Sequence, residues 1–510
     1  MNLPLQESMT TSNWRQHNAK FWSQLAQFYV NENIAAWNNK VPHLITNNPM
    51  HAQRYAQIIT QYILDCHRAD QNTKFAIFEV GAGLGKFGFL FVKHLIDLLD
   101  QCPNLSSKIQ YILCDQAKAT QTFWQQHPQI KPLIAKNIIH TALLSINSNL
   151  QISCNFPLTH LKQHRMILLA NYCFDSLPQS PFIINKARCI PCRIQTSARL
   201  TTQQPEKLSF NPVYKPTSEH SSCPTYNAIV DAHIPLGAEH FLMPDGALTL
   251  IQWFDQQTIH PLLILASDKG FSGFQKKQYD KDFNIVHSGA FASCVNFYAI
   301  SRFIEIALHG SSSLAPETEF GFATNLFLTK QAYQAYPGLT ITIRSTLRNI
   351  ESGIQFAIYK LLRTTPITKI EQIFYILNTL QYDPNILISL LPNIKTCLNQ
   401  DQSFSELDID RILKKIFANY FFTPHNSSLV ELIAIIELAL LSKRYIFARL
   451  LLNDFALWHG ENYEYHYFSG KFFFVQSEFI SAAHYFTNAL AINPDCKSSQ
   501  TYLEHCDTFL

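Results

Sequence analysis

The chain has 510 residues, of which 47% are hydrophobic and 15% charged, so it has enough apolar material for folded cores and no composition typical of long disorder. At about 100–200 residues per domain, this length predicts two to four units. The net charge of +3 comes from 40 basic and 37 acidic residues, and no run of one sign stands out, which argues against a nucleic-acid partner.

The first residues, MNLPLQESMTTSNW, lack the basic and apolar regions of a secretory signal, and the 12 cysteines are scattered along the chain. We therefore expect a cytoplasmic protein with reduced thiols. The longest apolar stretch, Leu429 to Leu441, is interrupted by Glu431 and Glu437 and is shorter than the roughly 20 residues that a membrane helix needs, so no membrane span is expected. Cys189 and Cys192 form a CxxC pair, but no second pair completes a zinc set, so no metal is expected.

Residues 1–70 are predicted to form an N-terminal helical segment. Aromatic and aliphatic residues recur at helical spacing from Trp14 to Trp37. A second helix is expected to begin at Asn48, which can cap it, with Pro49 at the first helical position, where its missing N–H costs nothing. This helix runs to about Cys66 and leads into the main sheet.

From residue 71 to about 345, short apolar runs alternate with helical stretches, which is typical of a mostly parallel sheet with helices on both faces. The expected strands are Phe75–Val80, Ile109–Cys114, Met166–Ala170 and Leu262–Ala266. Residues 180–243 are rich in Pro, Ser and Thr, and we interpret them as an insertion or lid. Functional residues are expected at the carboxyl ends of the strands, where ligands bind in such folds.

After about residue 345 helical periods replace the strands, which predicts a helical linker region over residues 346–428 and repeats over residues 429–510. Tyr445, Ala448 and Leu452 recur 34 residues later as Phe479, Ala482 and Phe486, the spacing of a tetratricopeptide (TPR) unit. The second copy also carries Gly470, Phe473, Ala489 and Pro494 at the positions that this repeat requires. An ordinary amphipathic hairpin is the alternative. TPR-like repeats would recruit a protein substrate or partner through a concave groove.

A glycine-rich turn follows the first strand of the sheet. The segment FAIFEVGAGLG is a buried strand that ends in an acid, Glu79, and is followed by three alternate glycines, Gly81, Gly83 and Gly85. Glycines at such a place allow a tight turn and let a ligand lie directly against the backbone.

Gly83, Gly85 and Gly88 also form a G-x-G-x-x-G pattern, which raises a nicotinamide dinucleotide as an alternative ligand. However, a dinucleotide fingerprint should begin directly after the strand, and its third glycine would then fall on Lys86. Glu79 would also repel a pyrophosphate, whereas S-adenosyl-L-methionine carries an ammonium and a sulfonium and no phosphate. The turn therefore predicts S-adenosyl-L-methionine as the cofactor.

A second acid, Asp115, stands at the end of the next strand. A carboxylate at this place can accept hydrogen bonds from both ribose hydroxyls of the cofactor. We therefore assign Asp115 to the cofactor site together with Glu79 and the three glycines; a solvated strand end is the alternative.

These residues resemble the MidA-like S-adenosylmethionine-dependent methyltransferases, in the variant with C-terminal TPR repeats. The segment Met166 to Pro178, MILLANYCFDSLP, is similar to the family's Ala-Asn-Glu leading into Phe-Asp-Ala-Leu-Pro. Ala266 to Gly270, followed by His287 and Val295-Asn296-Phe297, is similar to the TPR-bearing members. The resemblance covers roughly residues 70 to 340. It implies a Rossmann-like class I methyltransferase domain, followed by an all-α TPR-like domain, and methyl transfer to a protein arginine.

The family's Glu after Asn is Tyr172 in this chain. A guanidinium is best held by carboxylates in bidentate geometry, so this departure puts arginine in question and leaves Asp175 as the nearest acid of the motif. Asn171 and Asp175 are candidate catalytic residues that would align the acceptor with the methyl group, and Asn171 is also a candidate cofactor ligand. Alternatively, Asp175 caps the turn before Leu177-Pro178. His287 could contact the acceptor or take up its proton, or be a satisfied polar group.

Two functions stay open at this point. The first is a methyltransferase that modifies a protein side chain and recruits its substrate through the TPR-like repeats. The second is a non-catalytic assembly or adaptor protein with a vestigial cofactor-binding domain, a hypothesis that Tyr172 keeps open.

Overall fold

The chain forms two compact units, Met1–Ile354 and Gln355–Leu510, and each is considered by itself. The computed structural model describes residues 45–100, 102, 105–185, 188–199, 209–217, 223–236, 240–272, 293–315, 322–347, 367–400, 402–404, 407–424 and 426–509, with a few single positions before residue 45 and between 358 and 362. His287 and most of the helix expected from Trp14 to Trp37 therefore lie outside the described residues.

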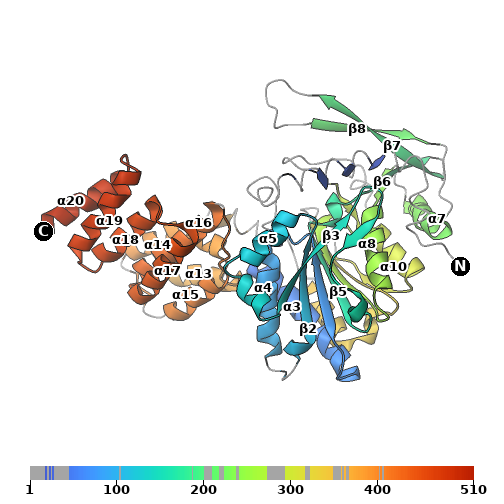
Figure 1. Cartoon of the computed structure of the whole chain (residues 1–510), viewed down its shortest axis with the longest axis horizontal. Helices are drawn as coiled ribbons and strands as arrows, with labels where there is room; N and C mark the ends of the chain where they lie inside the picture. The colour runs from blue at the N-terminus through green and yellow to red at the C-terminus, as the bar shows by residue number, and fades with distance from the viewer. Residues whose placement is uncertain are drawn as a thin grey trace. The chain divides into compact units, whose positions relative to one another are not determined.

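Within the described residues, the first unit is built on a mixed nine-stranded sheet (Figure 1). Its parallel part has the order β3-β2-β1-β5-β10. The bounds are Phe75–Val80 for β1, Ile109–Asp115 for β2, Ile139–Ile146 for β3, Arg165–Asn171 for β5 and Leu263–Phe271 for β10. All four strands expected from the sequence are thus present. The chain leaves β1 toward β2 and β3 on one side and returns to β5 and β10 on the other, so a crevice is expected at the carboxyl ends of β1 and β5.

Four shorter or antiparallel strands complete the sheet. Their bounds are Ile152–Cys154 for β4, Val295–Asn296 for β11, Ser311–Ser313 for β12 and Phe322–Leu328 for β13. β4 pairs with β3, and β13 lies antiparallel between β10 and β12. β11 pairs with the end of β10.

Helices cover both faces of the sheet because alternate residues of the buried strands point to opposite sides. On one side Phe78 packs against Phe254 of α8, at 5.1 Å between ring centroids. On the other side Glu79 lies against Gly88 of α4. Figure 1 shows the sheet between these two groups of helices. Their bounds are Pro49–Ala69 for α3, Lys86–Leu99 for α4, Lys118–Gln126 for α5, Lys131–Ala135 for α6, Asp245–Gln256 for α8, Phe297–Ala307 for α10 and Pro337–Ser345 for α11.

Helix α3 begins where the sequence predicts. The Asn48 side chain accepts a hydrogen bond of 2.9 Å from the backbone N–H of His51, and Pro49 occupies the first helical position. This cap stabilises the start of a helix that carries two buried aromatic side chains, Tyr55 and Tyr62, toward the sheet. The position of α3 therefore follows from a local signal, whereas its contacts depend on packing.

The segment interpreted as an insertion or lid forms a second, antiparallel sheet. It consists of β6 (Ser180–Asn185), β7 (Arg188–Arg199), β8 (Ser209–Pro216) and β9 (His240–Met243), in the order β8-β7-β6-β9, with helix α7 (Pro224–Asp231). Tyr226 of α7 donates a hydrogen bond of 3.0 Å to Asp245 of α8, which ties the insertion to this helix. Asn18 accepts from the N–H of Ile194 at 2.7 Å and so attaches the N-terminal segment to β7.

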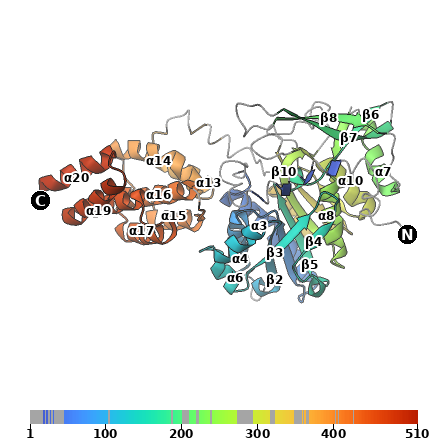
Figure 2. The ribbon, with the colours of Figure 1, turned by 45° about the horizontal axis from the view of Figure 1, so that its top comes forward.

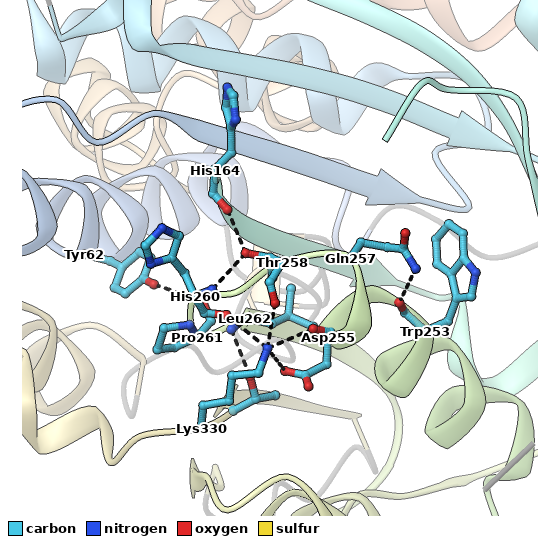
Figure 3. Close-up of polar contacts among 11 residues, drawn as sticks. Tyr62, His164, Trp253, Asp255, Gln257, Thr258, His260, Pro261, Leu262 and Lys330 are labelled. Atoms are coloured by element: carbon cyan, nitrogen blue, oxygen red, sulfur yellow. Dashed lines mark hydrogen bonds and ion pairs between the residues drawn. The ribbon is translucent and has the colours of Figure 1, made fainter. Parts of the chain in front are cut away.

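Lys330, which follows β13, holds the loop that leads into β10 (Figure 3). Its ammonium donates to the backbone carbonyls of Asp255 and Thr258, at 2.8 Å each, and lies 3.1 Å from the Asp255 carboxylate. These carbonyls lie in the last turn of α8 and just after it, where a cation is favourable. Lys330 therefore holds the loop before the amino end of β10 in place. This loop lies at the end of the sheet opposite to the carboxyl ends of the strands, where ligands are expected.

Replacing Lys330 with methionine is expected to lower the free energy of unfolding by about 2 kcal/mol, because three carbonyl groups and a carboxylate lose a shared donor. Urea denaturation measures this loss. Lys118→Met, an exposed lysine of α5, is the control and should change stability by less than about 0.5 kcal/mol. Equal effects of the two substitutions would contradict the role assigned to Lys330.

In its described residues the second unit consists of helices (Figure 2). They are α13 (Ile370–Thr379), α14 (Pro384–Asn399), α15 (Ile409–Ala418), α16 (Asn426–Leu441), α17 (Tyr445–His459), α18 (Tyr463–Phe474), α19 (Phe479–Ile492) and α20 (Lys497–Phe509). A side-chain carbon at Gly470 of α18 would come within 2.7 Å of the Phe486 ring on α19, so the small residue lets the two helices approach. The helical region expected from the sequence is present; its TPR nature stays a prediction.

A membrane-crossing helix is not found among the described residues, since none of the helices there is sufficiently long and apolar.

Candidate active site

The glycine turn between β1 and α4 depends on left-handed backbone conformations. Gly81, Gly83 and Gly85 have φ angles of 67°, 52° and 78°. A side-chain carbon at Gly85 would also lie 3.0 Å from both Ile130 and Trp124. Other residues adopt such angles at a cost, so each glycine predicted for the cofactor site has a conformational reason to be glycine. Gly81, directly after β1, is the exposed residue of this turn, whereas residues 82–85 are buried.

Glu79 is buried beside this turn. Only 3% of the residue is exposed, and its Oε2 accepts a hydrogen bond of 2.6 Å from the hydroxyl of Tyr111 on β2. A side-chain carbon at Gly88 would overlap the same oxygen. The third glycine of the apparent dinucleotide pattern thus makes room for Glu79. This explains Gly88 without a pyrophosphate.

Burial raises the pKa of Glu79 to about 8, since the hydroxyl of Tyr111 lowers it less than burial raises it, and the charge of Asp115 raises it further. At neutral pH the ligand-free protein therefore holds Glu79 mostly in its uncharged form. A cation placed next to this carboxyl group would favour its ionisation.

Asp115 joins the end of β2 to the glycine turn. Its Oδ2 accepts a hydrogen bond of 3.1 Å from the N–H of Gly83, and its Oδ1 accepts one of 3.1 Å from the N–H of Ala117. Burial raises its pKa, while these backbone donors lower it. Each carboxylate oxygen has a second lone pair, so both can still accept from ribose hydroxyls.

Two neighbouring cavities lie at the carboxyl edge of the sheet. The larger has about 900 Å³ of empty space, a volume that includes open solvent. Its lining includes Trp22, Val80, Gly81, Asp115, Leu144, Tyr172, Cys173 and Leu177. The smaller encloses about 300 Å³ and is lined by Thr46, Asn47, Glu79, Gly81, Ala82, Gly83, Leu84, Asn171 and Tyr172. Gly81 and Tyr172 belong to both linings, so one ligand could extend from one cavity into the other.

Asn171 and Tyr172, at the end of β5, each present a buried polar atom without a partner. The Oδ1 of Asn171 accepts a hydrogen bond of 2.9 Å from Tyr55, whereas its Nδ2 has none. Tyr172 has a left-handed φ of 49°, and its buried hydroxyl is likewise unpartnered. Burial raises the pKa of Tyr172 far above neutral pH, so its hydroxyl stays uncharged. Unpaired buried donors at a cavity are costly unless a ligand or water accepts from them.

Asp175 lies in a turn that is held by Asp268 of β10. Asp268 on β10 accepts hydrogen bonds of 3.1 Å from the backbone N–H groups of Cys173 and Asp175. Burial raises the pKa of both carboxyl groups, that of Asp175 to about 6, and their mutual repulsion favours one shared proton. Asp175 lies in this turn and outside the described lining of both cavities, which favours the structural alternative for it.

The structure thus brings Glu79, the three glycines, Asp115 and Asn171 to one edge of the sheet. Sequence reasoning missed three residues. Trp22 lines the larger cavity, and Tyr55 forms hydrogen bonds with both Asn171 and Ser267. Ser267 ends the β10 segment parallel to Asn171, so the rule that strand ends carry function could have found it. For Tyr55 no local signal exists, because a buried helical tyrosine is usually part of a core.

Residues 58–265 match the model of a family described as "Putative S-adenosyl-L-methionine-dependent methyltransferase". This span contains the glycine turn, Asp115 and Asn171. The match agrees with the enzyme class and the cofactor expected from the sequence. Among curated proteins, none matches the chain.

Solved structures that resemble the chain do so at low identity. An uncharacterized protein from Burkholderia thailandensis is 11% identical, with 66% of this chain and 97% of that one covered and a TM-score of 0.38. A protein from the same organism bound to S-adenosyl-homocysteine is 14% identical over 54% of this chain and 76% of that one, with a TM-score of 0.36. The plantazolicin methyltransferase BpumL, in complex with S-adenosyl-homocysteine, is 9% identical over 62% and 97%, with a TM-score of 0.31. Such scores support no conclusion about this chain.

Proposed function

We propose that the first unit transfers the methyl group of S-adenosyl-L-methionine to a protein side chain, and that the helical unit recruits this protein. The observation that carries the proposal is the glycine turn, where three left-handed glycines and a buried acid stand between β1 and α4. The family match over residues 58–265 supports the same reaction.

The two cavities suggest how the cofactor would lie. Asp115 would accept from the ribose hydroxyls in the larger cavity, with the adenine near Leu144. The amino-acid end would then extend past Gly81 into the smaller cavity, beside Glu79 and Asn171. The sulfonium would lie where the two cavities meet, close to Tyr172.

The transfer itself needs alignment more than activation. A lone pair of the acceptor attacks the methyl carbon, the carbon–sulfur bond breaks, and its electron pair stays on sulfur, which gives S-adenosyl-homocysteine. The acceptor then releases one proton. Because the sulfonium is already reactive, the protein has to hold the acceptor in line with the methyl group and exclude water. The buried surroundings of Asn171 and Tyr172 suit this task.

The charges around the site favour an uncharged acceptor over arginine. Glu79 and Asp115 are the acids in the described lining of the cavities, and both already accept hydrogen bonds from the protein. Tyr172 contributes a neutral hydroxyl. A guanidinium would thus approach a sulfonium without a bidentate carboxylate to hold it. A non-catalytic adaptor that only binds the cofactor is the second candidate. It is supported by Tyr172, which stands where the family motif has a glutamate.

Incubation with methyl-labelled S-adenosyl-L-methionine and a cell lysate separates the two candidates. We expect wild-type protein to label a protein and Glu79→Ala to lose at least about 90% of the label, because its cofactor contact is gone. Cofactor binding by both proteins is measured in parallel by calorimetry. Binding without label would favour the adaptor. Equal label from both proteins would contradict the site proposed here.

A further inference from the structure

Helix α3 reaches the candidate site through one hydroxyl group. Tyr55 is fully buried, and its hydroxyl lies 2.9 Å from Oδ1 of Asn171 and 2.6 Å from Oγ of Ser267. Asn171 ends β5, and Ser267 is its neighbour on β10. The hydroxyl of Tyr55 therefore bridges the end of β5 and the middle of the adjacent strand β10 from outside the sheet.

Ser267 connects this bridge to two further groups. Its Oγ lies 2.6 Å from Oγ1 of Thr324 on β13 and 3.3 Å from Nε2 of His51, one helical turn before Tyr55. Burial lowers the pKa of His51 to about 3, and the nearby Arg54 lowers it further. His51 is therefore a neutral imidazole with one N–H to give.

The hydrogens of this network can be assigned by counting donors. Tyr55 gives its single hydrogen to Asn171, so it accepts from Ser267. Ser267 has then used its own hydrogen and accepts from Thr324 and from Nε2–H of His51. Every hydrogen is used once, and the chain of donors ends at the amide oxygen of Asn171.

This direction fixes the orientation of the Asn171 amide. With Oδ1 held by Tyr55, the NH₂ group points the other way, where Nδ2 is buried and unpartnered in a residue that lines the smaller cavity. The lining of that cavity also includes the turn from Gly81 to Leu84, which leads into the N-terminus of α4. A helix N-terminus and an amide donor both favour a carboxylate between them.

We propose that Tyr55 is a positioning residue, which holds the amide of Asn171 so that Nδ2 donates to the carboxylate at the amino-acid end of the cofactor. The proposal rests on the proposed function, because it needs S-adenosyl-L-methionine or its product in the two cavities. Under this proposal helix α3, which is not part of the sheet, contributes to cofactor binding through Tyr55.

The experiment compares two ligands by calorimetry on the full-length protein. S-adenosyl-homocysteine carries the amino-acid end, whereas 5′-methylthioadenosine lacks it. Tyr55→Phe is expected to weaken S-adenosyl-homocysteine about tenfold and to leave 5′-methylthioadenosine within about twofold. Tyr62→Phe is the matched control, because this buried tyrosine lies two turns further along α3 and its hydroxyl is 3.4 Å from the carbonyl of Pro261. Loss of this hydroxyl should change the affinity for either ligand by no more than about twofold.

A double substitution tests whether Tyr55 acts through Asn171. In an Asn171→Ala background, adding Tyr55→Phe should change the affinity for S-adenosyl-homocysteine by less than about twofold. Asn171→Asp keeps the oxygen that Tyr55 contacts and removes the amide donor. It should lower the affinity for S-adenosyl-homocysteine by more than about tenfold and leave the affinity for 5′-methylthioadenosine unchanged. This variant tests the proposal if Tyr55→Phe does not fold.

Three results would overturn the proposal: equal losses for both ligands, the same loss in the Asn171→Ala background, or a loss from Tyr62→Phe as large as that from Tyr55→Phe. Wild-type protein that binds neither ligand would instead overturn the proposed function itself.

Discussion

Replacing Gly88 with alanine is expected to lower the free energy of unfolding by about 2–3 kcal/mol, although alanine is the better helix former. Gly88 lies inside α4, where helix propensity alone predicts a gain of about 1 kcal/mol. The new carbon would overlap Oε2 of Glu79 and lie 2.8 Å from Leu113 and 3.0 Å from Tyr111, two residues of β2. The carboxyl group of Glu79 and the side chains of Leu113 and Tyr111 would have to move.

The sign of the change in unfolding free energy shows whether the close contacts at Gly88 or the helix propensity of alanine has the larger effect. Chemical denaturation gives the change in free energy, and calorimetry with S-adenosyl-homocysteine is expected to show weaker binding, because the carboxyl group of Glu79 is displaced. Gly460→Ala is the control: nothing lies within 4 Å of the added carbon, and only its φ of 77° opposes the substitution. That control should lose about 1 kcal/mol and keep ligand binding. A gain in stability for Gly88→Ala would show that Glu79 does not lie where it is described.

The features that could be predicted from the sequence are those with a local cause. Gly81, Gly83 and Gly85 were assigned to a turn because few other residues accept a positive φ, and all three adopt one. The strand before them was recognisable because a strand buried on both faces is a continuous apolar run. Asp115 and Asn171 end the parallel strands β2 and β5, and the sequence placed both at the carboxyl edge of the sheet.

The features that could not be predicted depend on contacts between distant segments. Tyr55 precedes Asn171 by 116 positions, and only the packing of α3 on the sheet brings them together. Asp175 stands in the family motif, but the hydrogen bond from its backbone N–H to Asp268 of β10 joins two distant segments, and the motif alone does not predict it. The insertion was recognised by its composition, whereas its pairing into a separate sheet required register information that alternation alone does not contain.

The buried carboxyl group of Glu79 predicts a loss of stability as the pH rises. Its pKa is about 8 in the folded protein because of burial, whereas an unfolded glutamate has its ordinary value of 4.5. Between these values the folded state binds more protons than the unfolded state, so the contribution of Glu79 is fully present below about pH 4.5 and is lost as the pH rises through about 8. The slope reaches at most about 1.4 kcal/mol per pH unit.

Urea unfolding of wild type and Glu79→Gln between pH 5 and pH 8 measures this contribution. The glutamine can still accept from Tyr111 but does not titrate, so the stability of wild type relative to the variant should fall steadily across this range. Glu504→Gln, an exposed glutamate of α20, is the control for the substitution itself. A difference that is independent of pH would mean that Glu79 is already ionised in the folded protein.

The same titration connects Glu79 to the proposed cofactor. A sulfonium and an ammonium beside the carboxyl group would stabilise its charged form and lower its pKa toward the ordinary value. Saturating S-adenosyl-L-methionine should therefore flatten the pH dependence of wild-type stability, and the affinity for the cofactor should rise from pH 5 to pH 8, with a proton released on binding. In Glu79→Gln both effects should vanish. A cofactor that binds wild type with the same affinity at pH 5 and pH 8 would show that its positive charges lie away from Glu79, and the acid at the end of β1 would then serve only to hold Tyr111 and the glycine turn in place.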